Sequence, residues 1–465
     1  MTTKPAGDGD TAFLGHPRAL GYLAFTEAWE RFSYYGMQAL LVLYMTKTLL
    51  LAPHVDQIVG YAAFERAIQF VYRPGASTQA IASSIFGLYT SLVYLTPILG
   101  GFLADRVLGK TRTIVIGGLL MAAGHFLMAF DASFLLALLC LVLGTGCFKG
   151  NIAGQVGSLY GEKDLRRADA FQIFYLAINA GVIAAPLIAG TLGEKVGWHY
   201  GFGAAGVGML ISLVIYLWGR RHLPPDPPLR RTEKVERPKL KPGEGRTVAL
   251  LVLLLPVLTA SVLCNQQIFN AYLLWADKSV NLTFGGETLP TTWLVTLDSV
   301  VSVSFLALMV VFWRLWAKRF KEPDEIGKLT IGAFISVTGV LALAAGAYLA
   351  ETTGTKVNIW WCVLFHVLNS IAFANMLPVS LALYARAAPA ALGGTIIGVY
   401  YLHLFAGNQT VGILGRFLER MPASQFWLMH AAIAGGAAVV FLIVGRFFSS
   451  WLSHENVGKP LANQA

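Results

Sequence analysis

Twelve apolar stretches, each long enough to cross a lipid bilayer, set the first limit on how this chain can fold. A transmembrane helix needs about 20 mainly apolar residues, because backbone groups inside a bilayer must be paired within the segment. Charged residues make up 13% of the 465 residues, whereas a soluble domain carries about a quarter. The sequence therefore predicts an all-α integral membrane protein with twelve transmembrane helices. The stretches are 20–48, 80–104, 113–130, 133–158, 168–192, 200–219, 247–275, 291–316, 328–350, 357–385, 392–415 and 425–450.

The positive charges are distributed unevenly between the loops on the two sides of these spans. With both termini in the cytoplasm, 25 of the 35 Lys and Arg residues face the cytoplasm and 8 face the outer side. The opposite orientation would violate the positive-inside rule. The net charge of +10 therefore needs no nucleic-acid partner. We expect a multi-pass protein of a bacterial inner membrane with both termini cytoplasmic, and residues 1–15 are too polar for a cleavable signal.

Six spans precede residue 220 and six follow residue 247, and the segment between them is rich in Pro, Lys and Arg. Such a composition is typical of an extended cytoplasmic linker. Two six-helix bundles joined by a charged linker resemble the major facilitator fold, whose halves rock about a central site. The expected parts are a cytoplasmic N-terminus (1–19), an N-terminal bundle (20–219), the linker (220–246), a C-terminal bundle (247–450) and a cytoplasmic tail (451–465).

An insertion at 52–79 links the first two spans on the outer face. Its residues Val55–Tyr72 predict a short amphipathic helix, with Ile58, Ala62, Ile68 and Val71 on one side. A lid and a surface helix of no special role are both open interpretations.

Four cysteines lie in apolar helices without CxxC spacing, which favours packing over a disulfide framework or a metal site. No catalytic triad, phosphate loop or metal cluster occurs in a water-facing domain of the sequence. We therefore expect neither an enzyme nor a cofactor.

The first span carries charges in an otherwise apolar helix. Glu27, Glu30, Arg31, Tyr34 and Gln38 fall within an arc of about 100°, and Tyr35 lies just beyond it. Charges at membrane depth are costly and persist mainly where they face a bundle interior. The pattern predicts one polar face directed away from lipid.

Glu27, Glu30 and Arg31 form, with Lys149 of the fourth span, a four-member set whose net charge is zero when both acids are ionised. Protonation of Glu30 would break its pairing and free Arg31 or Lys149, so a mobile proton would change which ion pairs exist. The alternative is a structural network that holds the two helices together, although buried ion pairs stabilise poorly.

Three motifs of the first half resemble signatures of the proton-dependent oligopeptide transporter (POT) family of the major facilitator superfamily. Residues Glu27–Gly36 match ExxERFxYYG, Phe174–Gly181 match FYxxINxG, and Phe148–Asn151 read FKGN where the family usually has FKPN. The loop after the second span also resembles the superfamily's cytoplasmic signature, with Asp105 and the basic cluster expected to form breakable ion pairs. The expected gate residues are Gly101, Asp105, Arg106 and Gly109.

The resemblance also implies which residues hold substrate. Lys149, Tyr34 and Tyr35 would shape the pocket near a peptide's C-terminus, and Gln38 stands where many members carry another arginine. On the fifth span Gln172, Tyr175 and Asn179 share one face, and an Asn side chain suits a peptide amide. The remaining candidates are Tyr89, Asn265 and Tyr400.

The second half departs from the family. The stretch 264–270 lacks the family's usual Glu, and Phe373 stands five residues before Pro378, where the family usually has the Glu that holds a peptide's amino terminus. Asp298 occupies a position where the family has Asn. We expect Asp298 to supply the missing anionic partner and a second proton site. The alternative is an Asp at a helix end wetted by the outer surface.

The resemblance implies a proton-coupled symporter of short peptides that works by alternating access. We expect the protein to function as a monomer. Its partners would be protons, short peptides and the lipid bilayer. Two alternatives stay open: a proton-coupled importer of a non-peptide solute on the same fold, and a peptide sensor that binds without transport.

Overall fold

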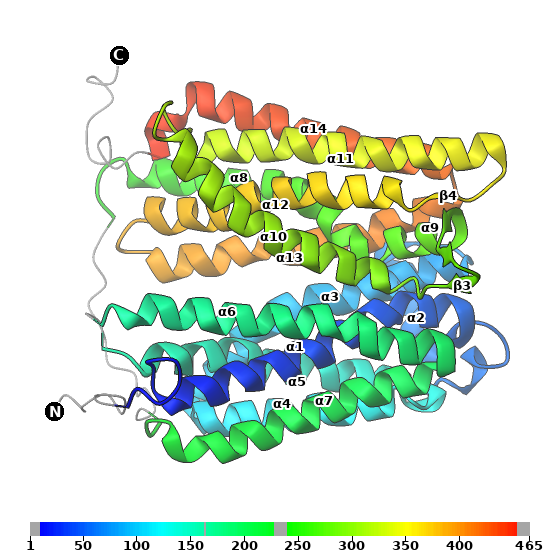
Figure 1. Ribbon diagram of the computed structural model, residues 1–465, viewed down its shortest axis with the longest axis horizontal. Helices are drawn as coiled ribbons and strands as arrows, with labels where there is room; N and C mark the ends of the chain where they lie inside the picture. Colours follow the sequence, from blue (N-terminus) through cyan, green and yellow to red (C-terminus); the bar gives the residue numbers. More distant parts are fainter. Residues whose placement is uncertain (1–9, 162–163, 227–239, 453–465) are drawn as a thin grey trace. The chain divides into compact units, whose positions relative to one another are not determined.

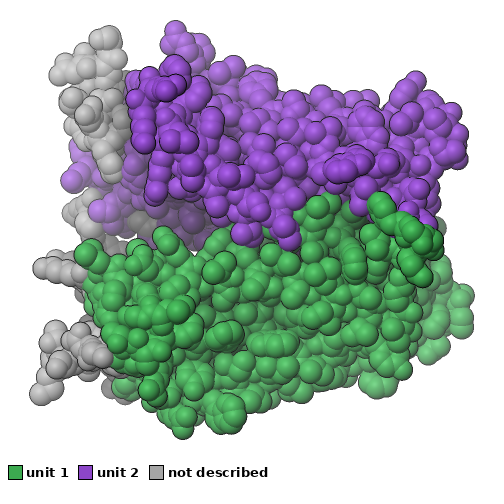
Figure 2. All heavy atoms as spheres, in the orientation of Figure 1, with its two compact units in different colours: residues 1–233, 284–299 green, residues 234–283, 300–465 purple. Residues whose placement is uncertain are grey.

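The computed structural model describes residues 10–161, 164–226 and 240–452. The chain divides into two compact units, one of residues 1–233 with 284–299 and the other of residues 234–283 with 300–465 (Figure 2). Helix α10 (Trp293–Trp316) therefore begins in the first unit and continues in the second. Each unit is a helical bundle.

The first unit holds seven α-helices among its described residues (Figure 1). Short π-helical turns follow α1 at Met45–Leu49, α3 at Ala104–Leu108, and α6 at Pro186–Gly190 and Leu192–Val196. A 3-10 turn, Arg220–His222, follows α7. Two further 3-10 turns lie at Val55–Gln57 and Asp131–Ser133. The helices are α1 (Arg18–Tyr44), α2 (Tyr61–Tyr72), α3 (Thr78–Leu103), α4 (Lys110–Leu127), α5 (Phe134–Ser158), α6 (Arg166–Ala185) and α7 (Trp198–Gly219).

Helix α1 packs along α6 and α7, while α4 packs against both α5 and α7. Small polar side chains join α1 to α7: Ser33 Oγ donates to the carbonyl of Ala205, and Ser212 Oγ donates to the carbonyl of Thr26, each at 2.7 Å. Such bonds replace water as partners for hydroxyl groups in a membrane bundle. They join a side of α1 next to its polar face to α7, and the polar face itself is also buried in the unit.

The second unit holds the remaining long helices. Its described elements are α8 (Glu244–Gln266), α9 (Ala271–Ser279), the rest of α10, α11 (Glu325–Thr353), α12 (Trp360–Ala387), α13 (Gly393–Gly415) and α14 (Ala423–Phe447). Strand β1 (Val280–Asn281) pairs in parallel with β4 (Val357–Asn358). Strand β2 (Thr283–Phe284), at the point where the chain passes from the second unit to the first, pairs with β3 (Glu287–Thr288) of the first unit. Two 3-10 turns, Arg416–Glu419 and Ser449–Leu452, follow α13 and α14.

The core of the second unit is formed by α8, α11, α12, α13 and α14. Leu251, Ala372 and Phe441 are fully buried in it, and Tyr384 Oη donates to the carbonyl of Leu251 at 2.6 Å. Asp324 caps the N-terminus of α11 by accepting from the amide of Gly327 at 2.8 Å. An N-cap of this kind satisfies one of the free amides of a first turn.

All twelve predicted spans are helical, which confirms the all-α prediction. One is interrupted: the stretch 247–275 breaks at Gln267–Asn270, so that α8 ends and α9 begins there. Among the described residues, nine helices are long and apolar enough to cross a membrane; α1, α4 and α13 fall outside that group. Helix α1 carries Glu27, Glu30 and Arg31 in its middle.

The predicted insertion helix is shorter than expected, and its predicted apolar face is only partly correct: Ile58 and Ile68 are buried, whereas Ala62 is exposed. It begins at Tyr61, after Gly60 with a φ of +79°, rather than at Val55. Ile68 and Tyr72, one turn apart, are buried, whereas Val71 is 60% exposed. The correct apolar face therefore follows the i, i+4 spacing of Ile68 and Tyr72.

Candidate functional site

Arg31 is shared by two carboxylates on its own helix. Its Nε lies 3.1 Å from Glu27 Oε1 and 2.5 Å from Glu30 Oε2. All three side chains are buried. The i, i+4 spacing brings Glu27 next to Arg31, and Glu30 directly precedes Arg31, so the whole cluster lies within about one turn of α1.

The cluster has more hydrogen-bonding capacity than the protein satisfies. Among the described residues, Glu27 Oε2, Glu30 Oε1 and Arg31 Nη2 are buried without a hydrogen-bond partner. Buried polar groups are paired in the great majority of cases, and leaving one unpaired costs about 1–3 kcal/mol. The arrangement therefore suits groups that gain a proton, a water or a ligand during function.

Lys149 of α5 is half-buried and lies against an aromatic ring. Its Nζ is 4.6 Å from the ring centroid of Tyr94 of α3, a cation–π distance. Among the described residues it forms no ion pair with Glu27 or Glu30, although its charge acts on both through space. The four predicted charges thus lie in one region, with Lys149 held by Tyr94 rather than by a carboxylate.

The predicted substrate residues of α1 and α3 surround this cluster. Arg31 Cζ lies 5.5 Å from the ring centroid of Tyr34, which packs edge-on against Tyr35. Gln38 and Tyr89 are buried, and neither Gln38 Oε1 nor Tyr89 Oη has a partner among the described residues. These buried atoms still have the capacity to bond to a water molecule or a ligand.

The two candidates on α6 are more exposed than those on α1. Tyr175 is 47% exposed, and Asn179 is half-buried. Asn179 Nδ2 donates to the carbonyl of Tyr175 at 2.7 Å, so this amide bonds back to its own helix. Its oxygen remains the group able to accept from a peptide amide.

The remaining candidates lie in α8, α10 and α13. Asn265 is half-buried near the end of α8. Tyr400 is buried, with Oη 2.9 Å from Ser380 Oγ and 3.2 Å from the carbonyl of Leu377. Asp298 is buried within the first two turns of α10, with 9% of its surface exposed. That burial favours the interior interpretation of Asp298 over a surface-wetted helix end.

The predicted gate motif occupies the connection between α3 and α4. Asp105 and Arg106 are exposed, and among the described residues Asp105 forms no ion pair, while Arg106 lies over the ring of Phe102. Gly101 has open space around its Cα. Gly109, with a φ of +80°, precedes α4 in a conformation that favours glycine.

Sequence reasoning missed Asp226, a linker residue that binds the start of α4. Its Oδ2 accepts from the Thr111 amide at 2.9 Å and its Oδ1 from the Thr111 hydroxyl at 3.0 Å. An Asp among prolines directly after a helix is visible in the sequence. Its hydrogen-bond partner could not be predicted, because Thr111 is 115 residues away in the chain. Tyr94 was missed for the same reason, because its role depends on how α3 crosses α5.

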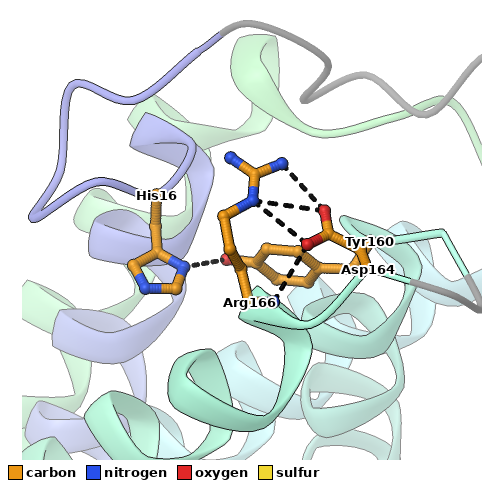
Figure 3. A network of polar contacts seen from close by, with 4 residues as sticks. All are labelled: His16, Tyr160, Asp164 and Arg166. Atoms are coloured by element: carbon orange, nitrogen blue, oxygen red, sulfur yellow. Dashed lines mark hydrogen bonds and ion pairs between the residues drawn. The ribbon is translucent and has the colours of Figure 1, made fainter.

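A second missed network joins the segment before α1 to the loop between α5 and α6 (Figure 3). His16 Nδ1 lies 2.8 Å from Tyr160 Oη, and Arg166 binds Asp164 with a shortest distance of 2.8 Å. The hydrogen bonds from Arg166 lower the pKa of the Asp164 carboxyl, while burial raises the pKa of Tyr160 to about 12. Tyr160 therefore keeps its proton near neutral pH and can donate a hydrogen bond to His16 Nδ1.

A sequence profile of the POT family matches residues 111–237 and 233–428. The chain belongs to the POT family. This POT-family chain is 31% identical to a di-/tripeptide transporter of Lactococcus lactis, over 90% of this chain and 80% of the relative. It is 27% identical to the peptide transporter YePEPT of Yersinia enterocolitica, over 96% and 97% of the two chains. It is 29% identical to the uncharacterized transporter YclF of Bacillus subtilis, over 93% and 95%.

Solved structures of the family agree with the architecture. A peptide transporter POT in complex with sulfate superposes with a TM-score of 0.81 and 26% identity, covering 94% of this chain and 96% of that one. A mutant of a peptide transporter POT in complex with alafosfalin gives 0.80 and 27%, covering 95% and 97%. The POT-family chain thus has the major facilitator fold, and its relatives are transporters rather than enzymes.

Proposed function

We propose that this POT-family chain is a proton-coupled symporter of short peptides that works by alternating access. The single observation that carries the proposal is the buried Glu27–Arg31–Glu30 cluster with its unpaired oxygens. A structural ion pair would gain from saturating these atoms, whereas a proton-binding site needs a carboxylate oxygen that is not already paired. Relatives named as peptide transporters support the choice of substrate.

Proton binding at Glu30 changes the charge of the cluster. With both acids ionised, two carboxylates compete for one Arg31 Nε, and the three groups sum to a net negative charge. A proton on Glu30 neutralises that net charge, and Arg31 then forms an ion pair with Glu27 alone. Lys149 then loses part of the field that favours its ammonium, so the proton changes the affinity of the region for an anion.

Lys149 is the residue we assign to the peptide's carboxylate. An ammonium against a tyrosine ring is held in place without its charge being neutralised. Its donors stay available to a carboxylate, which Tyr34, Tyr35 and Gln38 would help to orient. The buried carboxyl of Asp298 is assigned to the peptide's ammonium group.

A second candidate is a non-peptide solute on the same fold. Phe373, half-buried in α12, offers no charge to an ammonium group. If Asp298 does not supply that contact, a solute without an ammonium group is favoured.

We also propose an inner-membrane location, cytoplasmic termini, a functional monomer, and two bundles at 20–219 and 247–450 joined by the 220–246 linker.

Uptake of labelled dialanine into proteoliposomes under an imposed proton gradient tests the proposal. We expect accumulation that a protonophore abolishes, with protein-free vesicles as the baseline. Binding of dialanine without uptake would indicate a sensor. No dialanine binding would leave the non-peptide solute as the better candidate.

A further inference from the structure

A cavity of about 760 Å³ lies in the first unit, between the start of α4 and the end of α7. The segment that follows α7, up to Asp226, forms its third wall. In the orientation proposed above, this end of the unit is cytoplasmic. The cavity contains none of the residues assigned to proton or peptide binding.

The walls of the cavity continue into the lipid-facing surface. Ile116 of α4 and Leu217 of α7 line it and are 39% and 46% exposed. One turn further toward the middle of each helix, Leu119 and Val214 are also exposed. Apolar side chains on the outer face of a membrane helix contact acyl chains, so the cavity opens toward the hydrocarbon of the membrane.

The polar side of the cavity is basic. Arg112, in the first turn of α4, and Arg220, directly after α7, both line it and are exposed. The structure records no hydrogen bond or ion pair from either guanidinium to the other described residues. Asp226 also lines the cavity, but both of its oxygens already accept hydrogen bonds from Thr111.

We propose that this cavity binds an anionic glycerophospholipid of the inner leaflet, with its phosphate between Arg112 and Arg220 and its acyl chains along α4 and α7. Guanidinium groups bind phosphate through paired charge-assisted hydrogen bonds. Basic pockets between transmembrane helices at the cytoplasmic surface are suited to acidic headgroups. The apolar wall and the volume exceed what inorganic phosphate needs, which selects a lipid as the occupant.

The wild-type protein provides the first test. The purified full-length chain in detergent is melted with increasing dioleoyl phosphatidylglycerol, dioleoyl phosphatidylcholine or inorganic phosphate. We expect a saturable rise in the melting temperature with phosphatidylglycerol alone. An equal rise with phosphatidylcholine would show that the headgroup charge is not recognised, and an equal rise with phosphate would show that no lipid is required; either result overturns the proposal.

Two variants locate the effect. Arg112→Gln with Arg220→Gln should weaken the apparent affinity for phosphatidylglycerol at least about tenfold, given the typical gain per basic residue near an anionic surface. Lys318→Gln with Arg319→Gln removes the same charge from exposed positions outside the cavity and should leave the affinity unchanged. Val115→Phe, which fills the apolar wall without altering charge, should also weaken binding. Wild-type affinity in Val115→Phe and in the double arginine variant would contradict the assigned site.

Discussion

The carboxylate of Glu194 binds Thr292 twice, accepting from its amide at 2.8 Å and from its hydroxyl at 2.7 Å. The amide of Thr291 donates to the same carboxylate at 2.9 Å. Glu194 lies in the π-helical turn after α6, and Thr292 directly precedes α10. Gly190 makes the approach possible, because a Cβ there would lie 2.2 Å from Thr292 Oγ1. This contact explains why the first residues of α10 belong to the first unit.

Replacing Glu194 with Gln should lower stability. The amide retains one acceptor oxygen and turns the other into a donor, which would face N–H groups that need acceptors. The loss should be about 1–3 kcal/mol, measured as a lower melting temperature in detergent. Glu287→Gln, at an exposed position of β3, is the control and should melt like wild type. Equal melting of both variants would show that the Glu194 bonds contribute nothing.

Replacing Glu30 with Gln should separate transport from proton coupling. The neutral side chain mimics the protonated acid, so gradient-driven uptake should fall to the level of empty vesicles while exchange of peptide across the membrane persists. Both are measured in proteoliposomes with labelled dialanine. Glu65→Gln on α2 serves as the control. Gradient-driven accumulation by Glu30→Gln would remove Glu30 from the coupling mechanism.

Tyr94 should act through its ring rather than its hydroxyl. Tyr94→Phe keeps the surface under Lys149 and should transport nearly as well as wild type. Tyr94→Leu removes a cation–π contact of about 0.5–2 kcal/mol and should weaken peptide affinity by roughly 2- to 30-fold. The comparison is made from the concentration dependence of uptake. If Phe and Leu behave alike, the contact of the ring with Lys149 has no functional role.

Asp298 should matter only for substrates that carry an ammonium group. Asp298→Asn should abolish or sharply weaken uptake of dialanine because a neutral amide cannot balance a positive charge. An N-acetylated dipeptide, which lacks that charge, should show the same uptake in variant and wild type. Unchanged dialanine transport by Asp298→Asn would exclude this residue as the ammonium partner.

At acidic pH, Asp164 should no longer contribute to the stability of the folded protein. The hydrogen bonds from Arg166 lower the pKa of the Asp164 carboxyl in the folded protein below its unfolded value of about 3.9. The stabilisation is therefore fully present above the unfolded pKa, and it is lost as the pH falls through the lower folded pKa. Asp164→Asn should therefore melt slightly below wild type at pH 7. This difference should shrink at pH values below about 4. Asp56→Asn, at an exposed outer position, is the control, and a difference that persists in acid would contradict the assignment.

Much of the candidate site could be predicted from the spacing of residues along the sequence. Glu27, Glu30 and Arg31 lie on one helix, so the helical period and the cost of charge in a membrane were enough to predict a buried cluster. The interruption of the seventh predicted span was not predicted, because 247–275 is apolar enough on average to continue as one helix and polar residues such as Gln267 and Asn270 do not by themselves end a helix. Its break at Gln267–Asn270 involves a hydrogen bond between the side chains of Gln267 and Asn270.

Contacts between segments far apart in the chain could not be predicted from the sequence. Lys149 could have paired with either acid by charge alone, and only the crossing of α3 and α5 places its ammonium over Tyr94. The gate motif predicted ion pairs for Asp105, yet it is Asp226 that binds the first turn of α4. Both outcomes depend on which side chains neighbouring helices present to each other.

The amino-acid sequence by itself determined that the chain is helical, that it spans a membrane, and that α1 carries an internal polar face, since these follow from hydropathy and a period of 3.6 residues. Only the tertiary structure decided the partners of Lys149, Thr111 and Thr292. Their hydrogen bonds and ring contacts act over a few ångströms between residues that are 55 to 115 positions apart. Chain spacing does not determine those distances; helix packing does.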